Sequence, residues 1–510
     1  MLKENKIWIA QGEAPVYILP QMLNRHGLIT GATGTGKTVT LKVLTEALSD
    51  LGVPTFLADI KGDVSGLASA GVDNPNVSSR VEKFGVDGFE YKGFPVTFWD
   101  IYGKGGIPVR TTISEMGPII LSKLMDLNET QASVLSLVFK IADTQGLLLL
   151  DIKDLKAMLD YVYQNNKELA AQYGLMSTQT IGAVVRKVVF LEEQGADIFF
   201  GEPALDIQDW ICTDSNGRGM INVLHSVELF RQPTLYATFL LWMLSELFET
   251  LPEVGDVEKP KMVFFFDEAH LLFKDVPKAL VDRIELVVKL IRSKGVGVYF
   301  ISQSPSDIPD RVLSQLGNRI QHALRAYTPG EQKQVRAAAQ SFRTNPNFNT
   351  ETAIMELGTG EAIISTLDEN GTPQIAERAF VLPPQSLMAE VDASMRMSMI
   401  QNSSFNQKYM ESIDRFSAYE SLAEKMTQAG IEEEQEKVNL ELEKERLAFE
   451  KEKQKFEKEK EKLQKRKKTT TRHRQTPIEK GMNRTMSTIG NELGKAITRN
   501  IMESLLGRND

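Results

Sequence analysis

The sequence predicts an α/β fold with a mostly parallel sheet, and three observations indicate it. A glycine-rich loop at residues 31–38 follows a short apolar stretch at 27–30 and precedes a helical pattern that starts at Val39 and stops near Gly52. A second apolar run at 53–59 then completes a strand, helix and strand in the order of a right-handed βαβ unit. Further apolar runs, bulky enough for buried strands, follow at 94–100, 220–224, 262–266 and 298–302.

The loop matches the phosphate-binding pattern G-x-x-x-x-G-K-[ST] and lies between a strand and a helix. Its glycines let backbone N–H groups wrap an anion, and the helix N-terminus adds partial positive charge. Lys37 is expected to contact the β- and γ-phosphates, and the Thr38 hydroxyl to ligate Mg²⁺. We therefore predict ATP and Mg²⁺ as cofactors. The expected nucleotide-binding residues are Gly31, Ala32, Thr33, Gly34, Thr35, Gly36, Lys37, Thr38 and Val39.

Two carboxylates follow the apolar run at 262–266. Asp267 is expected to hold the water shell of Mg²⁺, and Glu268 to polarise the water that attacks the γ-phosphate. Acidic residues often end a strand before a helix, but together with the phosphate-binding loop this pair favours hydrolysis over nucleotide storage. Gln303, at the end of the next apolar run, is a candidate sensor of the γ-phosphate or the attacking water.

Other polar residues near predicted strand ends keep two interpretations open. Asp59, Lys61 and Asp63 either face the nucleotide or a translocated polymer, or form a solvated loop. The glycine-rich loop at 103–106 lacks a Lys-Thr pair, so a second phosphate site there is weakly supported.

Three arginines flank the run at 298–302 and the strand that follows it, namely Arg292, Arg319 and Arg325. A guanidinium is planar and permanently charged, which suits an arginine finger that reaches the nucleotide of a neighbouring subunit. Each arginine alone also suits a surface or salt-bridged position.

Composition and charge limit the class of protein. The 510 residues suffice for two or three domains, and the net charge of −9 argues against a nucleic-acid coat protein without excluding a local basic channel. Cys212 is the only cysteine, so no intrachain disulfide can form and a reducing compartment is expected. The N-terminus lacks the apolar run of a signal peptide, and the apolar window at 235–251 contains two glutamates. We therefore predict no transmembrane helix and a cytoplasmic location.

The pattern divides the chain into six parts. Residues 1–112 and 219–385 are predicted to form the two parts of one core, with the hairpin signal Asn370-Gly371 in the second part. The remaining parts are a helical insertion at 113–218, a helical arm at 386–430, a charged helix with a basic linker at 431–480, and a short amphipathic helix at 481–510.

The charged helix keeps two interpretations open. One apolar residue recurs every seven from Leu442 to Leu463, while positions that would complete the seam, such as Arg446, are charged. The segment is either a coiled coil that pairs with a protein partner or a solvated helix held by Glu–Lys pairs. The basic linker is either a tether for DNA or anionic lipid, or a disordered spacer. The final helix is expected to dock or assemble rather than to anchor in a membrane.

Taken together, the motifs resemble the HerA/FtsK class of P-loop motor ATPases, and within it a bacterial helicase HerA-like family. The resemblance covers about residues 7–385 and implies a RecA-like core of the additional-strand type. It also implies a homo-oligomer in the form of a hexameric ring and ATP-driven translocation of double-stranded DNA. The motifs that carry it are residues 31–38, 59–63, 265–270, 301–304 and 357–362.

The resemblance implies a role for each matching residue. Catalytic roles fall to Lys37, Glu268 and Gln303, and Mg²⁺ binding to Thr38 and Asp267. An arginine acts in trans, for which Arg319 is the first candidate and Arg325 the second.

Two departures keep other functions open. HerA proper begins with a β-barrel domain that the residues before the loop are too few to form, and no nuclease motif is visible here. A coupling motor for conjugation or secretion shares the core but usually has membrane spans. A protein-remodelling ATPase would respond to polypeptide instead of DNA. A nucleotide switch that scaffolds partners through the charged tail is opposed by Asp267 and Glu268.

Overall fold

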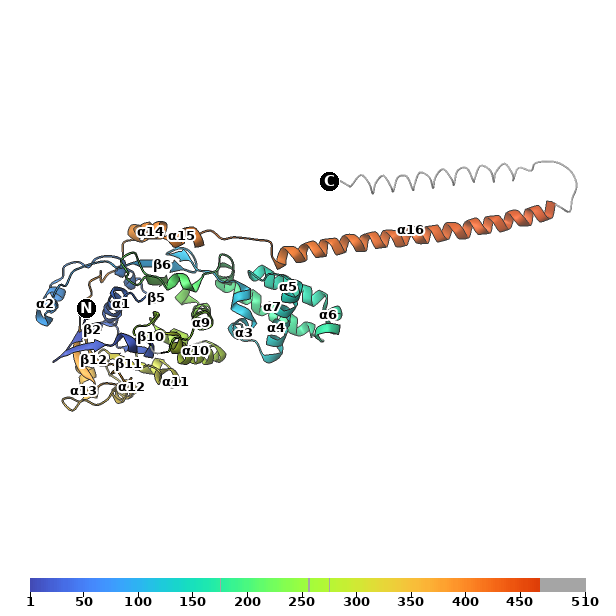
Figure 1. The fold of residues 1–510 in the computed structure, drawn as a ribbon. Helices are drawn as coiled ribbons and strands as arrows, with labels where there is room; N and C mark the ends of the chain where they lie inside the picture. Colours follow the sequence, from blue (N-terminus) through green and yellow to red (C-terminus); the bar gives the residue numbers. More distant parts are fainter. Residues whose placement is uncertain (175, 256, 275, 468–510) are drawn as a thin grey trace. The chain divides into compact units, whose positions relative to one another are not determined.

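The computed structural model, which describes residues 1–174, 176–255, 257–274 and 276–467, contains one 13-stranded sheet (Figure 1). The strand order is β1-β2-β13-β12-β11-β4-β10-β9-β5-β8-β6-β7, with β3 paired to β2 outside this path. The strands are β1 (Leu2–Lys3), β2 (Lys6–Gln11), β3 (Pro15–Ile18), β4 (Gly27–Thr30), β5 (Thr55–Asp59), β6 (Val96–Asp100), β7 (Ile107–Pro108), β8 (Ile221–His225), β9 (Met262–Phe266), β10 (Val296–Ser302), β11 (Asn318–Gln321), β12 (Glu361–Ser365) and β13 (Glu377–Val381).

The strands from β11 to β7 pair in parallel, whereas β12, β13 and β2 join antiparallel on the β11 side. This confirms the predicted mixed α/β fold with a mostly parallel sheet. The strands of the first βαβ unit are not neighbours, because β10 and β9 lie between β4 and β5. The carboxyl ends of β4, β10, β9 and β5 therefore meet at one edge, where open α/β sheets bind ligands.

The central strands are apolar because helices and loops cover both of their faces. Every residue of β5, β9 and β10 is buried. Aromatic rings fill the core, since Phe56 of β5 lies 5.3 Å from Phe264 of β9 and 4.9 Å from Trp210 between ring centroids. This packing makes the strand ends a rigid platform for the residues that follow them.

Helices surround the sheet and continue into the insertion and the C-terminal part of the chain (Figure 1). The described α-helices are α1 (Lys37–Asp50), α2 (Pro75–Phe84), α3 (Ile113–Leu124), α4 (Glu129–Gln145), α5 (Ile152–Gln164), α6 (Asn166–Tyr173), α7 (Thr178–Leu191), α8 (Asp197–Phe199), α9 (Pro233–Thr250), α10 (Lys278–Ile291), α11 (Asp310–Leu313), α12 (Pro329–Gln340), α13 (Thr350–Glu356), α14 (Ala393–Asn402), α15 (Ser404–Tyr409) and α16 (Ala418–Lys467).

Two of the buried charged residues of α1, Glu46 and Lys42, tie this helix to the segment after β13. Glu46 accepts hydrogen bonds from the backbone N–H groups of Gln385 and Ser386 and from the Ser386 hydroxyl. Lys42 donates to the carbonyl of Leu387 at 2.5 Å. Burial raises the pKa of Glu46 to about 7 and lowers that of Lys42 to about 8. The end of the core is thus fixed against the helix that follows the phosphate-binding loop.

The helices α3 to α7 lie within the segment at 113–218, and the starts of three of them follow from local sequence. The caps Thr112, Asn128 and Asp151 each accept a hydrogen bond from an N–H group in the first turn, in reciprocal capping boxes. α3 is broken at Gly117, which has φ 70°, and Pro118 follows it directly.

The predicted hairpin forms between β12 and β13. Asp368 caps its turn, because its carboxylate accepts from the N–H groups of Asn370 and Thr372 and its carbonyl accepts from Gly371. A small second core, which includes Val335 of α12, packs beneath β12.

The segment at 386–430 is helical only in part, because residues 386–392 and 410–417 are not helical and Ser403 separates α14 from α15. Contacts group residues 1–424 into one compact unit, and a second unit begins at Lys425. From Lys425 on, the side chains of α16 that the structure describes are solvent-exposed, with Lys437 paired to Glu433 at 2.8 Å. The predicted domain boundaries and coiled coil stay predictions, and the amphipathic helix at 481–510 lies outside the described residues. No helix in the described ranges has the length and apolar character needed to cross a membrane.

Candidate active site

The phosphate-binding loop connects β4 to α1 at the edge where the central parallel strands end. Backbone bonds fix its start, because the N–H groups of Gly31 and Ala32 donate to the carbonyls of Ser302 and Ala323. Gly31 has φ 154°, and a Cβ atom there would lie 2.5 Å from the Cβ of His322. A side chain at this position would therefore displace the loop. The first turn of α1 leaves its N–H groups without intrahelical partners, so they are free to bind an anion.

Lys37 lies inside the loop. Its ammonium group donates to the carbonyls of Gly31 at 2.6 Å and Ala32 at 3.1 Å, and the residue is only 9% exposed. Burial, followed by the nearby charge of Lys61, lowers the pKa of Lys37. An anion in the loop would stabilise this buried ammonium group further, as expected for a phosphate-binding lysine.

His322, which the sequence analysis did not single out, supports the loop from behind. One ring nitrogen lies 2.8 Å from the Thr40 hydroxyl and the other 2.9 Å from the carbonyl of Glu361. Burial lowers the pKa of His322 to about 4, so the ring is neutral at physiological pH. Gly360 adds a backbone bond from its N–H group to the carbonyl of Thr35. No local pattern marks His322, because its partners come from other parts of the chain.

The predicted carboxylate pair lies beside the loop, at the end of β9. Asp267 is 6% exposed, and one of its oxygens accepts from the N–H group of Glu268 at 2.9 Å. Burial raises the pKa of Asp267 to about 6, although the charge of Lys61 opposes the shift. Thr38 and Asp267 are the residues that would hold Mg²⁺. A hydroxyl and one carboxylate fit this ion, because Mg²⁺ keeps several waters and takes its other ligands from phosphates.

Glu268 is held by a cation from the loop that follows the neighbouring strand β5. The Lys61 ammonium lies 2.6 Å from one carboxylate oxygen, and the other oxygen lies 3.4 Å from the His270 ring nitrogen. Burial alone would raise the pKa of Glu268, but the hydrogen bond and charge of Lys61 outweigh it and lower the pKa. Glu268 has φ 48°, in the left-handed region, which indicates a backbone constrained for a particular side-chain position.

The loop at 59–63 therefore does more than connect two elements. Asp59 turns it, because its carboxylate accepts from the N–H group of Gly62 at 2.7 Å, and burial raises the pKa of Asp59 to about 6. The turn directs Lys61 to Glu268. The sequence placed Lys61 near the site but could not show this contact, since the two residues are 207 positions apart.

Of the other predicted catalytic residues, Gln303 and Arg325 follow the carboxyl ends of β10 and β11, whereas Arg319 lies in the amino-terminal half of β11. Gln303 follows β10, whose Ser302 is paired with Thr30 just before the loop, and it is exposed. The Arg319 guanidinium donates to the carbonyls of three residues of its own chain, Leu316, Leu313 and Ser341.

Arg325 is exposed and donates to the carbonyls of Met355 and Leu357. Arg292 is also exposed. The roles of these residues stay predictions.

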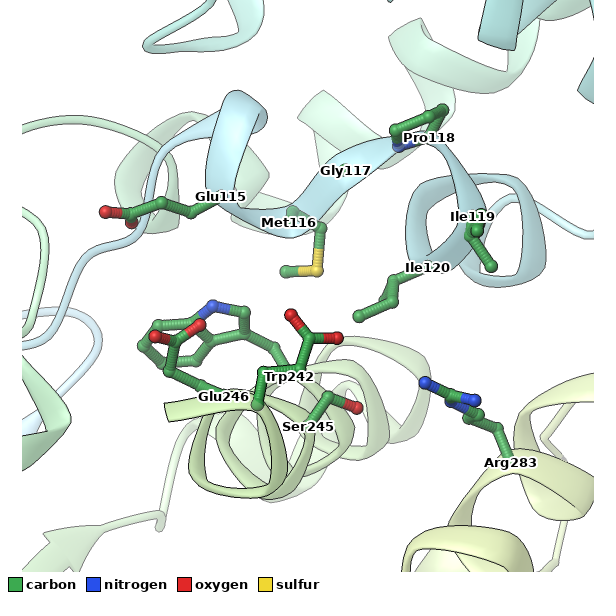
Figure 2. A pocket seen from close by; sticks show the side chains of 11 residues that line it. Glu115, Met116, Gly117, Pro118, Ile119, Ile120, Trp242, Ser245, Glu246 and Arg283 are labelled. Carbon is green, nitrogen blue, oxygen red and sulfur yellow. The ribbon is translucent and has the colours of Figure 1, made fainter. Parts of the chain in front are cut away.

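A cavity of about 170 Å³ lies elsewhere, where the kinked α3 faces α9 and α10 (Figure 2). Figure 2 shows Trp242 and Glu246 of α9 and Arg283 of α10 around the Gly117–Pro118 break. Among the described residues that line it, none belongs to the phosphate-binding loop or to the ends of β5, β9 and β10. We therefore assign the site to the loop and not to this cavity.

Comparison with known proteins agrees with this geometry. The family model "Helicase HerA-like C-terminal" matches residues 4–510. The DNA double-strand break repair helicase HerA of Sulfolobus acidocaldarius is 24% identical over 352 residues, which are 67% of this chain and 62% of that protein. A protein of Methanocaldococcus jannaschii named "Probable helicase MJECL08" is 32% identical over 154 residues, 28% of each chain. The chain thus spans about three fifths of the length of the Sulfolobus relative and less of the other.

Solved structures show the same fold. The bacterial conjugative coupling protein TrwB, without its N-terminal segment, matches with a TM-score of 0.50 and 16% identity over 77% of this chain and 92% of that one. TrwB in complex with ADP and Mg²⁺ matches equally well in shape, at a TM-score of 0.50 and 15% identity, with the same coverage of both chains. The core is accordingly a RecA-like P-loop NTPase, and the chain belongs to the helicase HerA-like C-terminal family.

Proposed function

We propose that this protein is an ATP-hydrolysing motor that translocates double-stranded DNA as a ring-shaped, hexameric homo-oligomer. The observation that carries the ATPase part is the meeting of Lys37, Asp267 and Glu268 at one edge of the sheet. An acid pair beside a phosphate-binding loop suits hydrolysis, because one carboxylate can serve the metal while the other polarises water.

Each residue has one task in this proposal. The loop N–H groups and Lys37 bind and orient the phosphates, and Thr38 and Asp267 hold Mg²⁺, which supplies positive charge to the phosphate oxygens when bound. Glu268 accepts the proton of the attacking water. Gln303 orients the water or the γ-phosphate.

The DNA and ring parts rest on family membership and on the name of the Sulfolobus relative, a DNA double-strand break repair helicase. A ring allows an arginine of one subunit to reach the nucleotide of the next. Arg325 is more exposed than Arg319, whose guanidinium is taken up by three carbonyls of its own chain. We therefore place Arg325 before Arg319 as the arginine in trans, which reverses the order expected from the sequence.

The test is steady-state ATP hydrolysis by the purified protein without DNA, with short duplexes and with long duplexes at equal total base pairs. Stimulation that grows with duplex length, weakens at higher salt and is lost in Glu268→Gln supports a DNA translocase. Native mass measurements with ATP and Mg²⁺ report the ring size. Hydrolysis that ignores DNA but responds to unfolded polypeptide would contradict translocation of DNA and favour a protein substrate.

A further inference from the structure

A groove opens beside the phosphate-binding loop, between α2 and the β12–β13 hairpin. It encloses about 520 Å³ and is lined by Gly36 and Val39 at the loop and by Phe84 and Phe380 farther away. This volume is within the range of pockets that hold small-molecule ligands. We call it the α2 groove.

The α2 groove begins where a nucleotide has to leave the loop. Phosphates bound to the loop lie against the N–H groups and Lys37, and the nucleoside extends from the phosphate farthest from the γ-position. Gly36 and Val39 flank Lys37 and Thr38 in the sequence and form the wall of the groove at this point. The neighbouring cavity, which Phe84 and Phe380 also line, has no loop residue among its described lining residues.

The far walls offer the flat apolar surface that a base needs. The rings of Phe84 and Phe380 are 6.1 Å apart between centroids, and both residues are half-buried. The Lys83 ammonium lies 4.7 Å from the centroid of the Phe380 ring, and the Arg80 guanidinium 5.6 Å. Aromatic rings stack on any base, and nearby cations suit the phosphate and ribose oxygens.

Arg80 connects the groove to the loop. Its guanidinium donates to the carbonyl of Thr359, just before β12, at 2.9 Å and to that of Val381, the last residue of β13, at 3.4 Å. These bonds join α2 to the residues where the hairpin starts and ends. It also lies over Gly360, where an added Cβ atom would come within 2.5 Å of it. Gly360 in turn donates to the carbonyl of Thr35 in the loop. The groove walls and the phosphate cradle are therefore one connected structure.

We propose that the α2 groove holds the nucleoside half of a nucleoside triphosphate, with the base packed against Phe84 and Phe380. The α2 helix is then part of the nucleotide site and not a mere connection between β5 and β6. The inference rests on the proposed function, because it takes the phosphates to lie in residues 31–38.

The experiment compares two ligands, ADP and inorganic tripolyphosphate, by calorimetry of the full chain with Mg²⁺. Tripolyphosphate lacks a nucleoside, so it reports on the loop alone. Phe84→Ala is expected to weaken ADP about tenfold, the loss typical of one aromatic ring stacked on a base. Its matched control is Phe89→Ala, which removes a half-buried ring that packs on Tyr91 outside the groove.

A second pair of variants fills the groove instead of emptying it. Ser79→Trp places a bulky side chain in the lining, whereas Ser78→Trp changes the adjacent exposed residue outside it. Ser79→Trp is expected to lower ADP affinity and leave tripolyphosphate binding unchanged, and Ser78→Trp to change neither.

The ratio of ADP to tripolyphosphate affinity decides the outcome. A fall in this ratio in Phe84→Ala and Ser79→Trp, but in neither control, supports the inference. An unchanged ratio, including an equal loss of both ligands, overturns it while leaving nucleotide binding at the loop intact. A wild-type chain that binds neither ligand overturns the proposed function as well, so the two failures are distinguishable.

Discussion

Two glycine-rich loops, at residues 31–38 and 103–106, leave the parallel strands β4 and β6 at the same edge of the sheet. In the second loop, the Asp100 carboxylate accepts from the backbone N–H groups of Tyr102 at 2.9 Å, Lys104 at 3.0 Å and Gly105 at 2.7 Å. The Asp100 carboxylate is thus an internal anion for the second loop, and the three N–H groups that it binds are not available to another anion.

The first loop has the opposite arrangement. The N–H groups at the start of α1, where this loop ends, have no intrahelical partners, and the charged group inside the loop is the cation of Lys37. His322 supports this loop. Its ring is neutral, so it does not compete with the loop for an anion. We infer that a glycine-rich turn can bind phosphate when the N–H groups at the start of the following helix stay free and a cation lies beside them.

The largest effect that follows from this comparison concerns the two lysines. Lys37→Ala is expected to lower ATP hydrolysis by about 10²-fold or more, because a buried cation aimed at the phosphates is lost. Lys104→Ala, in the second loop, is expected to leave the rate within about twofold, since Lys104 is exposed and pairs with Glu228 at the surface. Equal losses in both variants, measured as steady-state rates at saturating ATP, would contradict the distinction between the loops.

The neutral histidine behind the first loop gives a pH dependence of stability. Its folded pKa of about 4 is below the unfolded value of 6.5, so the unfolded chain binds more protons between these values. Stability is fully present above pH 6.5 and is lost as the pH falls toward 4, by roughly 3 kcal/mol for one such histidine. His322→Gln is expected to reduce this loss in urea unfolding measured across that range.

His26 provides the control, because it is equally buried, has a pKa lowered to about 4 and accepts from the N–H group of Val298 away from the loop. His26→Gln is expected to change the pH dependence of stability in the same direction but not the affinity for ADP. His322→Gln is expected to weaken ADP binding, since it alters the support of the loop. Identical ADP affinities of both variants would show that His322 does not support the phosphate site.

Removing the internal anion of the second loop is expected to cost stability only. Asp100→Asn replaces a carboxylate that accepts three N–H groups by an amide with one acceptor oxygen, at a cost of about 1–3 kcal/mol. Urea unfolding measures the loss, and calorimetry with ADP is expected to show unchanged affinity. A gain of phosphate binding at the second loop in this variant would instead mean that Asp100 masks a second site.

The smallest effect is a displaced pH profile at the carboxylate pair. Lys61→Met removes the hydrogen bond and charge that lower the pKa of Glu268, so this pKa rises. Glu268 has to be ionised to accept a proton, and the loss of hydrolysis on acidification is therefore expected to begin at a higher pH than in the wild type. If hydrolysis by Lys61→Met fell at the same acidic pH as in the wild type, this result would contradict the pairing of Lys61 with Glu268 in the working enzyme.

The sequence predicted those features of the fold that depend on residues close together in the chain. The loop at 31–38, the apolar strand before Asp267 and the turn at Asn370-Gly371 all formed where local pattern placed them. Each is defined by residues within a few positions of one another, so that backbone geometry and burial follow from the local sequence.

The contacts that complete the site come from distant segments and have no local signal. His322 reaches Thr40 across 282 positions, and Lys61 reaches Glu268 across 207. These contacts depend on the order of strands in the sheet, in which β10 and β9 separate β4 from β5. The spacing of apolar residues predicts that a segment forms a strand but not which strand it pairs with. The partners of Lys61 and His322 could therefore be found only in the folded chain.

The central claim, that this site hydrolyses ATP, is tested most directly by comparing wild type with Glu268→Gln for both ADP binding and ATP hydrolysis. The substitution keeps the size of the side chain and removes the proton acceptor, so ADP affinity is expected to stay within about twofold while hydrolysis falls by about 10²-fold or more. Hydrolysis by Glu268→Gln at the wild-type rate would contradict the assignment of Glu268 as the residue that activates water.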